Sequence, residues 1–271
     1  MGGSLEQHQG RVDDYFHRLA YGNDPFQYGE LYLPESPGPH PVVQLTHGGF
    51  WRKAYDLTLM HGLAEHLVTQ GIAAWNIEYR RIGNPGGAWP GTFLDVAAAT
   101  DYLSILAPTY KLDMQRVVAV GHSAGGHLAC WLACRHLLPR DSAIRTERTP
   151  LRLRGVVSLA GVVDLQQAWQ LHLGQNAVQE LLQASLTEQP ARYMEASPAA
   201  LLPSGIPQVL VHGSADDRVP IEISQAYAHK ARAAGEHIRL LELPGADHFI
   251  LIDPGSEAWQ LTVKEIKHLL R

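Results

Sequence analysis

The stretch VVAVGHSAGGHLA, which begins at Val117, constrains the fold more than any other part of the sequence. Its apolar, β-branched start is typical of a buried strand, and its end is rich in helix-forming residues. Between them the letters GHSAG fit the pattern GxSxG, with Ser123 at the centre. The flanking glycines permit a tight turn, so we expect a strand to pass directly into a helix here. Such a turn projects the serine hydroxyl above the edge of a sheet.

The rest of the chain repeats this alternation of strand-like and helix-like segments. Short apolar runs closed by Gly, Pro or polar residues recur between longer helical stretches. The pattern predicts an α/β fold in which helices flank a mainly parallel central sheet of about eight strands. We expect strands within residues 26–34, 41–49, 71–80, 116–123, 154–161, 206–213 and 237–245. We expect helices near residues 56–70, 91–106, 124–137, 221–234 and 257–270.

The length of the chain, 271 residues, favours a single large domain with a substantial buried core. We expect a partly disordered N-terminal extension at residues 1–20 and one domain at residues 21–271. Residues 164–203 are the least regular region, because Gln- and Leu-rich helical fragments meet segments that contain Pro and Gly. We predict that they form a small cap insertion above the sheet. An ordinary crossover connection is the alternative.

Charge and composition exclude several classes of partner. The formal net charge of −5 and the lack of any basic run longer than a pair argue against nucleic acid. The apolar runs are too short to span a bilayer, and the polar first residues lack the apolar core of a signal peptide, so we expect a cytoplasmic location without a membrane partner. Two cysteines without a second ligand pair predict neither disulfides nor a metal site. We expect no cofactor, and a homodimer is a further expectation.

A serine in a GxSxG turn needs two further groups to act as a nucleophile. Its hydroxyl is weakly nucleophilic near neutral pH, so it requires a base, which is in turn oriented by a carboxylate. In folds that contain this turn, the acid and then the histidine follow on loops after later strands. The segment HGSADDRVP supplies Asp216 and Asp217, and LELPGADHF supplies His248 after the last expected strand. We favour Asp216, because it lies four residues after His212 as in the similar HGxxDxxVP pattern.

Backbone donors are also required, because the attack of the serine on a carbonyl places negative charge on the carbonyl oxygen. One donor is expected to be the N–H of Ala124, which follows the serine. The loop HGGFW follows an earlier strand, and its glycines allow the amides of Gly49 and Phe50 to turn inward as further donors. We expect His47 to anchor this loop by hydrogen bonds and Glu78, at the end of the neighbouring strand, to help hold it.

Together, the segments HGGFW, EYR, GHSAGGHLA, HGSADDRVP and GADHF resemble the serine α/β-hydrolases of the esterase and lipase superfamily. Within it, HGG followed by an aromatic residue and Trp is similar to kynurenine formamidase-like enzymes and small bacterial carboxylesterases. The resemblance implies an α/β-hydrolase fold with Ser123, Asp216 and His248 as the catalytic residues. The chain departs from the hormone-sensitive-lipase relatives, which carry a third glycine in place of Phe50 and usually DYRLAPE where this chain reads EYRRIGNPGGAWPGTF.

These departures place aromatic residues near the expected pocket. We predict that Phe50, Trp51, Trp89 and Val219 contact the substrate, although buried aromatic residues more often belong to a core. The main hypothesis is a serine hydrolase that cleaves carboxylic esters of small substrates through an acyl-enzyme intermediate. An alternative is an arylformamidase that hydrolyses amides of the N-formylkynurenine type. A catalytically inactive binding protein with the hydrolase fold would need one of the three catalytic residues to be missing.

Overall fold

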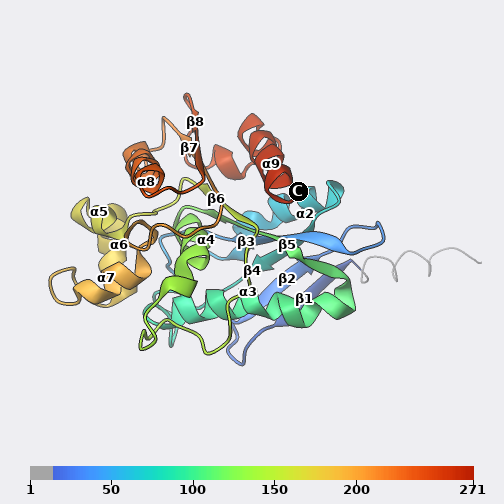
Figure 1. Ribbon diagram of the computed structural model, residues 1–271, viewed down its shortest axis with the longest axis horizontal. Helices are drawn as coiled ribbons and strands as arrows, with labels where there is room; N and C mark the ends of the chain where they lie inside the picture. Colours follow the sequence, from blue (N-terminus) through green and yellow to red (C-terminus); the bar gives the residue numbers. More distant parts are fainter. Residues whose placement is uncertain (1–14) are drawn as a thin grey trace, which may run out of the picture.

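An eight-stranded sheet runs through the centre of the protein (Figure 1). The computed structural model describes residues 15–271. The strand order is β1-β2-β4-β3-β5-β6-β7-β8, in which β1 and β2 pair antiparallel with their neighbours and all the other pairs are parallel. The predicted α/β fold with a mainly parallel sheet is therefore confirmed. The strands are β1 (Phe16–Ala20), β2 (Tyr28–Tyr32), β3 (His40–Thr46), β4 (Ala73–Ile77), β5 (Leu112–His122), β6 (Gly155–Leu159), β7 (Gln208–Gly213) and β8 (Ile238–Leu243).

The first strand was not among those expected from the sequence. β1 pairs with β2 from Phe16 opposite Tyr32 to Ala20 opposite Tyr28. Its side chains alternate between exposed and half-buried, so it lacks the apolar run that signals a buried strand. The last residues of the expected extension at 1–20 therefore belong to the sheet. Residues 1–14 lie outside the described part of the chain.

Helices cover both faces of the sheet (Figure 1). Alternate residues of the central strands point to opposite faces, so each face has its own buried cluster. Val118 and Val120 of β5 pack in the cluster with α2 and α9, whereas Val117 and Ala119 pack in the cluster with α3, α4 and α8. The five helices predicted from the sequence are all present. The helices are α2 (His61–Thr69), α3 (Gly91–Tyr110), α4 (Ala124–Cys134), α5 (Leu165–Gln170), α6 (Leu173–Leu182), α7 (Pro190–Ala196), α8 (Ile221–Ala233) and α9 (Glu257–Leu269).

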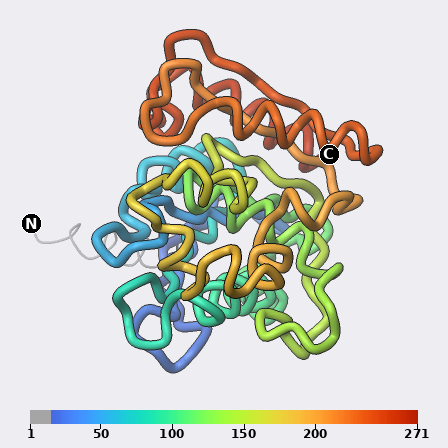
Figure 2. Tube along the Cα trace, turned by 90° about the vertical axis from the view of Figure 1, so that its left-hand side faces the viewer, coloured from blue at the N-terminus to red at the C-terminus, as the bar shows by residue number. Residues whose placement is uncertain are grey.

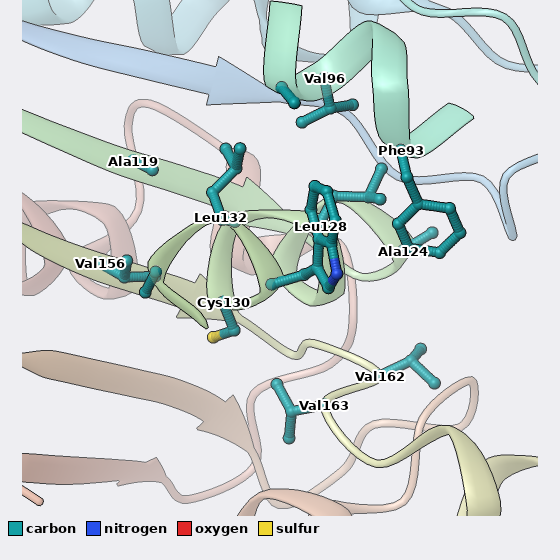
Figure 3. Close-up of a cluster of buried hydrophobic side chains, with 14 of the residues drawn as sticks. Phe93, Val96, Ala119, Ala124, Leu128, Cys130, Leu132, Val156, Val162 and Val163 are labelled. Atoms are coloured by element: carbon teal, nitrogen blue, oxygen red, sulfur yellow. The ribbon is translucent and has the colours of Figure 1, made fainter. Parts of the chain in front are cut away.

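Helix α4 is buried along its whole length. Figure 3 shows it between α3, which carries Phe93 and Val96, and the loop after β6, which carries Val162 and Val163. Cys130 on this helix is a buried core residue, and burial raises the pKa of its thiol to about 12. The N-terminus of α4 is thus fixed by packing on several sides, and this is the end that follows Ser123.

Residues 164–203 contain α5, α6, α7 and the short 3-10 turn η3 (Pro198–Ala200). The three helices lie together at one end of the sheet in Figure 1, the end that faces the viewer in Figure 2. The start of α6 is not regular, because Gly174, Gln175 and Asn176 all have left-handed backbone conformations. We call residues 164–203 the 164–203 segment.

Candidate active site

Ser123 occupies the turn between β5 and α4 that the sequence predicts. Its backbone angles are φ 56° and ψ −120°, a strained conformation for a residue other than glycine. A Cβ atom at Gly125 would lie 2.0 Å from the carbonyl oxygen of Thr46, and one at Gly121 would lie 2.0 Å from that of Gly125. Both positions of the motif therefore require glycine. The amide of Ser123 donates to the carbonyl of Leu159 at 2.8 Å, which ties the turn to β6.

The loops after β7 and β8 bring Asp216 and His248 into contact. Nδ1 of His248 donates to Oδ2 of Asp216 at 2.6 Å, and the other oxygen, Oδ1, accepts from the amides of Arg218 and Val219 at 2.8 and 2.9 Å. Asp217 is exposed and lies 3.3 Å from the guanidinium of Arg218. Of the two adjacent carboxylates, the structure thus places Asp216 against the histidine and Asp217 in solvent.

A second histidine supports the charge on Asp216. Nε2 of His212, which is completely buried, lies 3.3 Å from Oδ2 of Asp216 and donates to the carbonyl of Val219 at 2.9 Å. Burial alone would raise the pKa of Asp216, but hydrogen bonds from His212 and His248 outweigh it and hold this pKa well below its usual range. Asp216 is therefore ionised at neutral pH and can stabilise positive charge on His248.

His122, the variable residue of GHSAG, contacts the same histidine. Its Nε2 donates to the backbone carbonyl of His248 at 2.9 Å, and the two ring centroids are 4.5 Å apart. Burial, reinforced by the charge on His248, lowers the pKa of His122 to about 3, so the ring is neutral at physiological pH. The sequence analysis did not assign His122 a role. The one available signal was a polar residue at the end of an otherwise apolar strand.

The loop after β3 passes directly beside the serine. Gly49, Phe50 and Trp51 have φ values of 103°, 49° and 56°, so three successive residues lie in the left-handed region. A Cβ atom at Gly48 would lie 2.9 Å from Cβ of Ser123, which leaves room only for glycine. This close approach brings the loop beside the serine.

His47 and Glu78 hold the base of this loop. Nε2 of His47 lies 3.0 Å from Oε1 of Glu78, and both side chains are buried. The imidazole also stacks on the ring of Tyr79 at 4.5 Å, and the Tyr79 hydroxyl donates to the carbonyl of His47 at 3.0 Å. The expected contact between the loop and the neighbouring strand end is therefore present.

These segments meet at a cavity of about 100 Å³. Polar residues in its lining are Ser123, His122, His248 and Arg218. Most of the remaining lining is apolar, and Phe249 is 49% exposed. Neither the lining by Arg218 nor that by the apolar side chains other than Phe50 was predicted from the sequence. The lining residues are Gly49, Phe50, Tyr55, Leu59, His122, Ser123, Arg218, His248 and Phe249.

Three of the residues expected to contact substrate do not line this cavity. Trp51 is 1% exposed, and its Nε1 donates to Nδ1 of His127 at 3.2 Å. Trp89 packs edge-on against Phe93, with ring centroids 5.8 Å apart. Val219 is buried, and its backbone holds the Asp216 loop. In this structure the three side chains pack in the core, whereas Phe50 lines the cavity. Contact of these three with substrate stays a prediction.

The described residues, 15–271, also bear on metal binding and on membrane insertion. In this part of the chain, no group of three or more His, Cys, Asp or Glu side chains is placed to hold a metal ion. Over the same residues, no helix combines the length and the apolar character needed to cross a bilayer.

The sequence matches the BD-FAE family over residues 30–231, which is most of the chain. The chain belongs to the BD-FAE family. The BD-FAE match runs from β2 into α8, so it includes Ser123 and Asp216 and ends before His248. The family match therefore includes the turn at Ser123 and the loop that carries Asp216, and the structure places His248 against Asp216.

Curated relatives of this BD-FAE chain are named as esterases. The chain is 28% identical over 251 residues to esterase LipC of Mycobacterium tuberculosis, which covers 88% of the chain and 61% of LipC. It is 26% identical over 257 residues to isoprenylcysteine alpha-carbonyl methylesterase ICME of Arabidopsis thaliana, which covers 87% of the chain and 57% of ICME. The chain thus spans between about half and three fifths of the length of the curated relatives it matches.

Solved structures share the fold of this BD-FAE chain. A bifunctional GH43-CE protein from Bacteroides eggerthii has a TM-score of 0.83 at 19% identity, over 95% of this chain and 36% of that one. Esterase 2 of Thermogutta terrifontis, phosphonylated by sarin, has a TM-score of 0.77 at 20% identity, over 94% of each chain. The likeness establishes the α/β-hydrolase fold that the sequence motifs predicted.

Proposed function

We propose that this protein hydrolyses carboxylic esters of small substrates through an acyl-enzyme intermediate. The observation that carries the proposal is the 2.6 Å contact between Asp216 and His248 at a cavity that Ser123, in its strained turn, also lines. Family membership supports it, and so do the esterase names of LipC and the Thermogutta protein. The three side chains come from three separate loops, which is the arrangement that serine hydrolysis requires.

In this proposal each side chain has a role that its contacts support. Because Nδ1 of His248 donates to Asp216, the ring is held in the tautomer whose Nε2 is free to accept a proton from Ser123. Oγ of Ser123 attacks the carbonyl carbon, and the proton moves to Nε2 of His248. The imidazolium then returns this proton to the leaving alcohol, and the acyl group stays on the serine. Water, activated by the same imidazole, attacks the acyl-enzyme and releases the acid.

The oxyanion is bound in this proposal by the amides of Gly49, Phe50 and Ala124. The Ala124 amide stands at the N-terminus of α4, where backbone N–H groups have no partner within the helix and favour negative charge. The left-handed backbone from Gly49 onward supports this role, because successive backbone amides in such a turn can bind an anion. Each donor of this kind contributes roughly 10²–10³ in kcat in enzymes where it has been removed.

The test combines turnover with labelling of the serine. Purified protein is assayed with p-nitrophenyl acetate and butyrate, and Ser123→Ala is compared with Ser104→Ala, a matched variant of an exposed serine on α3. We expect Ser123→Ala to lose at least about 10³ in kcat and Ser104→Ala to keep full activity. A fluorophosphonate should add to the peptide that contains Ser123 and to no other. Retained activity in Ser123→Ala would refute the mechanism.

The same assay distinguishes the two alternatives that the sequence left open. N-formylkynurenine is included, because the same groups can attack a formamide. A higher kcat/KM for this amide than for the esters would replace ester hydrolysis by formamide hydrolysis. A folded protein that turns over neither substrate and takes up no fluorophosphonate would be a binding protein.

Three further parts of the proposal were expected from the sequence. They are a homodimer, a cytoplasmic location and the role of the 164–203 segment as a cap. Light scattering after size-exclusion chromatography tests the first, and cell fractionation tests the second. The third is supported by the position of the segment at the same end of the sheet as the site, and hydrogen exchange with and without fluorophosphonate tests it.

A further inference from the structure

Phe50 is held in a backbone conformation that does not suit it. Its φ of 49° lies in the left-handed region, which is unfavourable for residues with a side chain and free of strain for glycine. The related hydrolases with three glycines have no ring at this position. A strained residue that a glycine would relieve points to a role for its side chain.

The ring of Phe50 separates the cavity from the 164–203 segment. It lines the cavity together with Ser123. It also meets Gly174, where an added Cβ atom would lie 2.4 Å from Cδ1 of Phe50. The ring is therefore wedged between the nucleophile and α6, with no free space behind it for a second side chain.

The segment behind the ring is fastened to the same loop. Nε of Arg52 donates to Oε2 of Glu180 at 2.9 Å, and Nη2 of Arg52 donates to the carbonyl of Gln175 at 3.2 Å. The amide of Trp89 donates to the carbonyl of Leu181 at 2.7 Å. These hydrogen bonds hold α6 against the Phe50 ring and so restrict the movement of the ring.

The proposed reaction fixes which part of the substrate faces this ring. The leaving oxygen must lie near Nε2 of His248, which protonates it, and the carbonyl oxygen must lie near the amides of Gly49 and Phe50. The acyl chain is the remaining substituent of the carbonyl carbon. An acyl chain that extends away from His248 shares the cavity with the Phe50 ring.

We propose that the Phe50 ring, seated on Gly174, closes the acyl side of the cavity and restricts the enzyme to esters of short-chain carboxylic acids. The small size of the cavity, about 100 Å³, agrees with this limit. The inference rests on the proposed ester hydrolysis and adds its acyl specificity. Removal of the ring enlarges the cavity towards α6, so longer acyl chains can bind.

The test measures kcat/KM for p-nitrophenyl acetate, butyrate, hexanoate and octanoate. Phe50→Gly keeps the backbone amide, accepts the observed φ and removes the ring. Relative to wild type, we expect the octanoate-to-acetate ratio to rise at least about tenfold, since one methylene in an apolar pocket already changes specificity by about that factor. Phe50→Ala provides a second opening variant.

A matched pair of glycine variants tests the backing of the ring. Gly174→Ala should push the ring into the cavity and lower the butyrate-to-acetate ratio. Gly205→Ala places the same methyl group at another left-handed glycine, with φ of 69° and no atom within 4 Å, and should leave the ratio unchanged. Circular dichroism and thermal melts confirm that each variant is folded.

The outcomes separate this inference from the proposed function. If wild type hydrolyses acetate and both Phe50 variants keep its chain-length profile, the inference is overturned and ester hydrolysis stands. A wild-type preference for octanoate over acetate also overturns it. If wild type hydrolyses no ester and takes up no fluorophosphonate, the proposed function itself fails.

Discussion

His127 is expected to make the protein unstable in mild acid. Its ring lies on α4 and is completely buried. Nδ1 accepts from Nε1 of Trp51 at 3.2 Å, and Nε2 donates to the carbonyl of Ala196 at 2.9 Å. The neutral ring thus joins the loop after β3 to the 164–203 segment. A proton on Nδ1 would remove the acceptor for Trp51.

The magnitude follows from the pKa of His127. Burial lowers this pKa from 6.5 to about 4. Between these values the unfolded chain binds a proton that the folded chain does not, so acid favours unfolding. The contribution of neutral His127 to the free energy of unfolding is fully present above pH 6.5 and falls by about 1.4 kcal/mol per pH unit below it. By about pH 4 the loss reaches about 3 kcal/mol, a large part of the stability of an ordinary domain.

The assay is urea denaturation of wild type and His127→Gln at several values between about pH 7.5 and 4.5. Glutamine can accept from Trp51 and donate to Ala196, but it does not titrate. The other titrating groups are common to both proteins and cancel in the difference between their free energies of unfolding. The excess of wild type over His127→Gln in this free energy should therefore decrease by about 1.4 kcal/mol per pH unit below pH 6.5. His229→Gln, at an exposed histidine on α8, should follow wild type. Parallel curves for wild type and His127→Gln would refute the reasoning.

Three further substitutions test the site and its support. Asp216→Asn should lower kcat by about 10⁴-fold in a folded protein, because the imidazole loses its orientation, while Asp217→Asn keeps wild-type kcat; equal kcat in both would contradict the choice of carboxylate. Glu78→Gln should lower the free energy of unfolding by about 3–5 kcal/mol, because it leaves a buried arginine without its carboxylate, and an unchanged urea midpoint would argue against that ion pair. Gly125→Ala should lower the stability by about 1–3 kcal/mol through the clash with Thr46, which a melting curve like that of wild type would disprove.

The fold was predictable because local and global signals agree. The segment around Ser123 shows its strand, its glycine-bounded turn and its helix within one short stretch, and the structure contains all three. The choice of Asp216 over Asp217 depended on spacing from His212, and in the structure His212 does contact Asp216. Motif spacing therefore carried geometric information here.

The substrate residues were harder to predict. Phe50 and Trp51 are neighbours with nearly the same φ, yet one ring lines the cavity and the other is buried beside His127. Which face of the loop meets the core is decided by α4 and α6, which are distant in sequence. The role of His122 was missed for the same reason, since its partner His248 lies on another loop.

Because β8 is an edge strand of the sheet, the parts of the site differ in local stability. His248 follows this strand, two of whose side chains are exposed, whereas Ser123 stands between the central strand β5 and the buried α4. Marginal strands open with less free energy than the centre of a sheet. Mild heat or a low concentration of denaturant should therefore unfold the loop that carries His248 while the turn at Ser123 is still folded. Enzymatic activity would then be lost before the far-ultraviolet circular dichroism signal. An activity assay would therefore report on unfolding at the edge of the sheet rather than in the core.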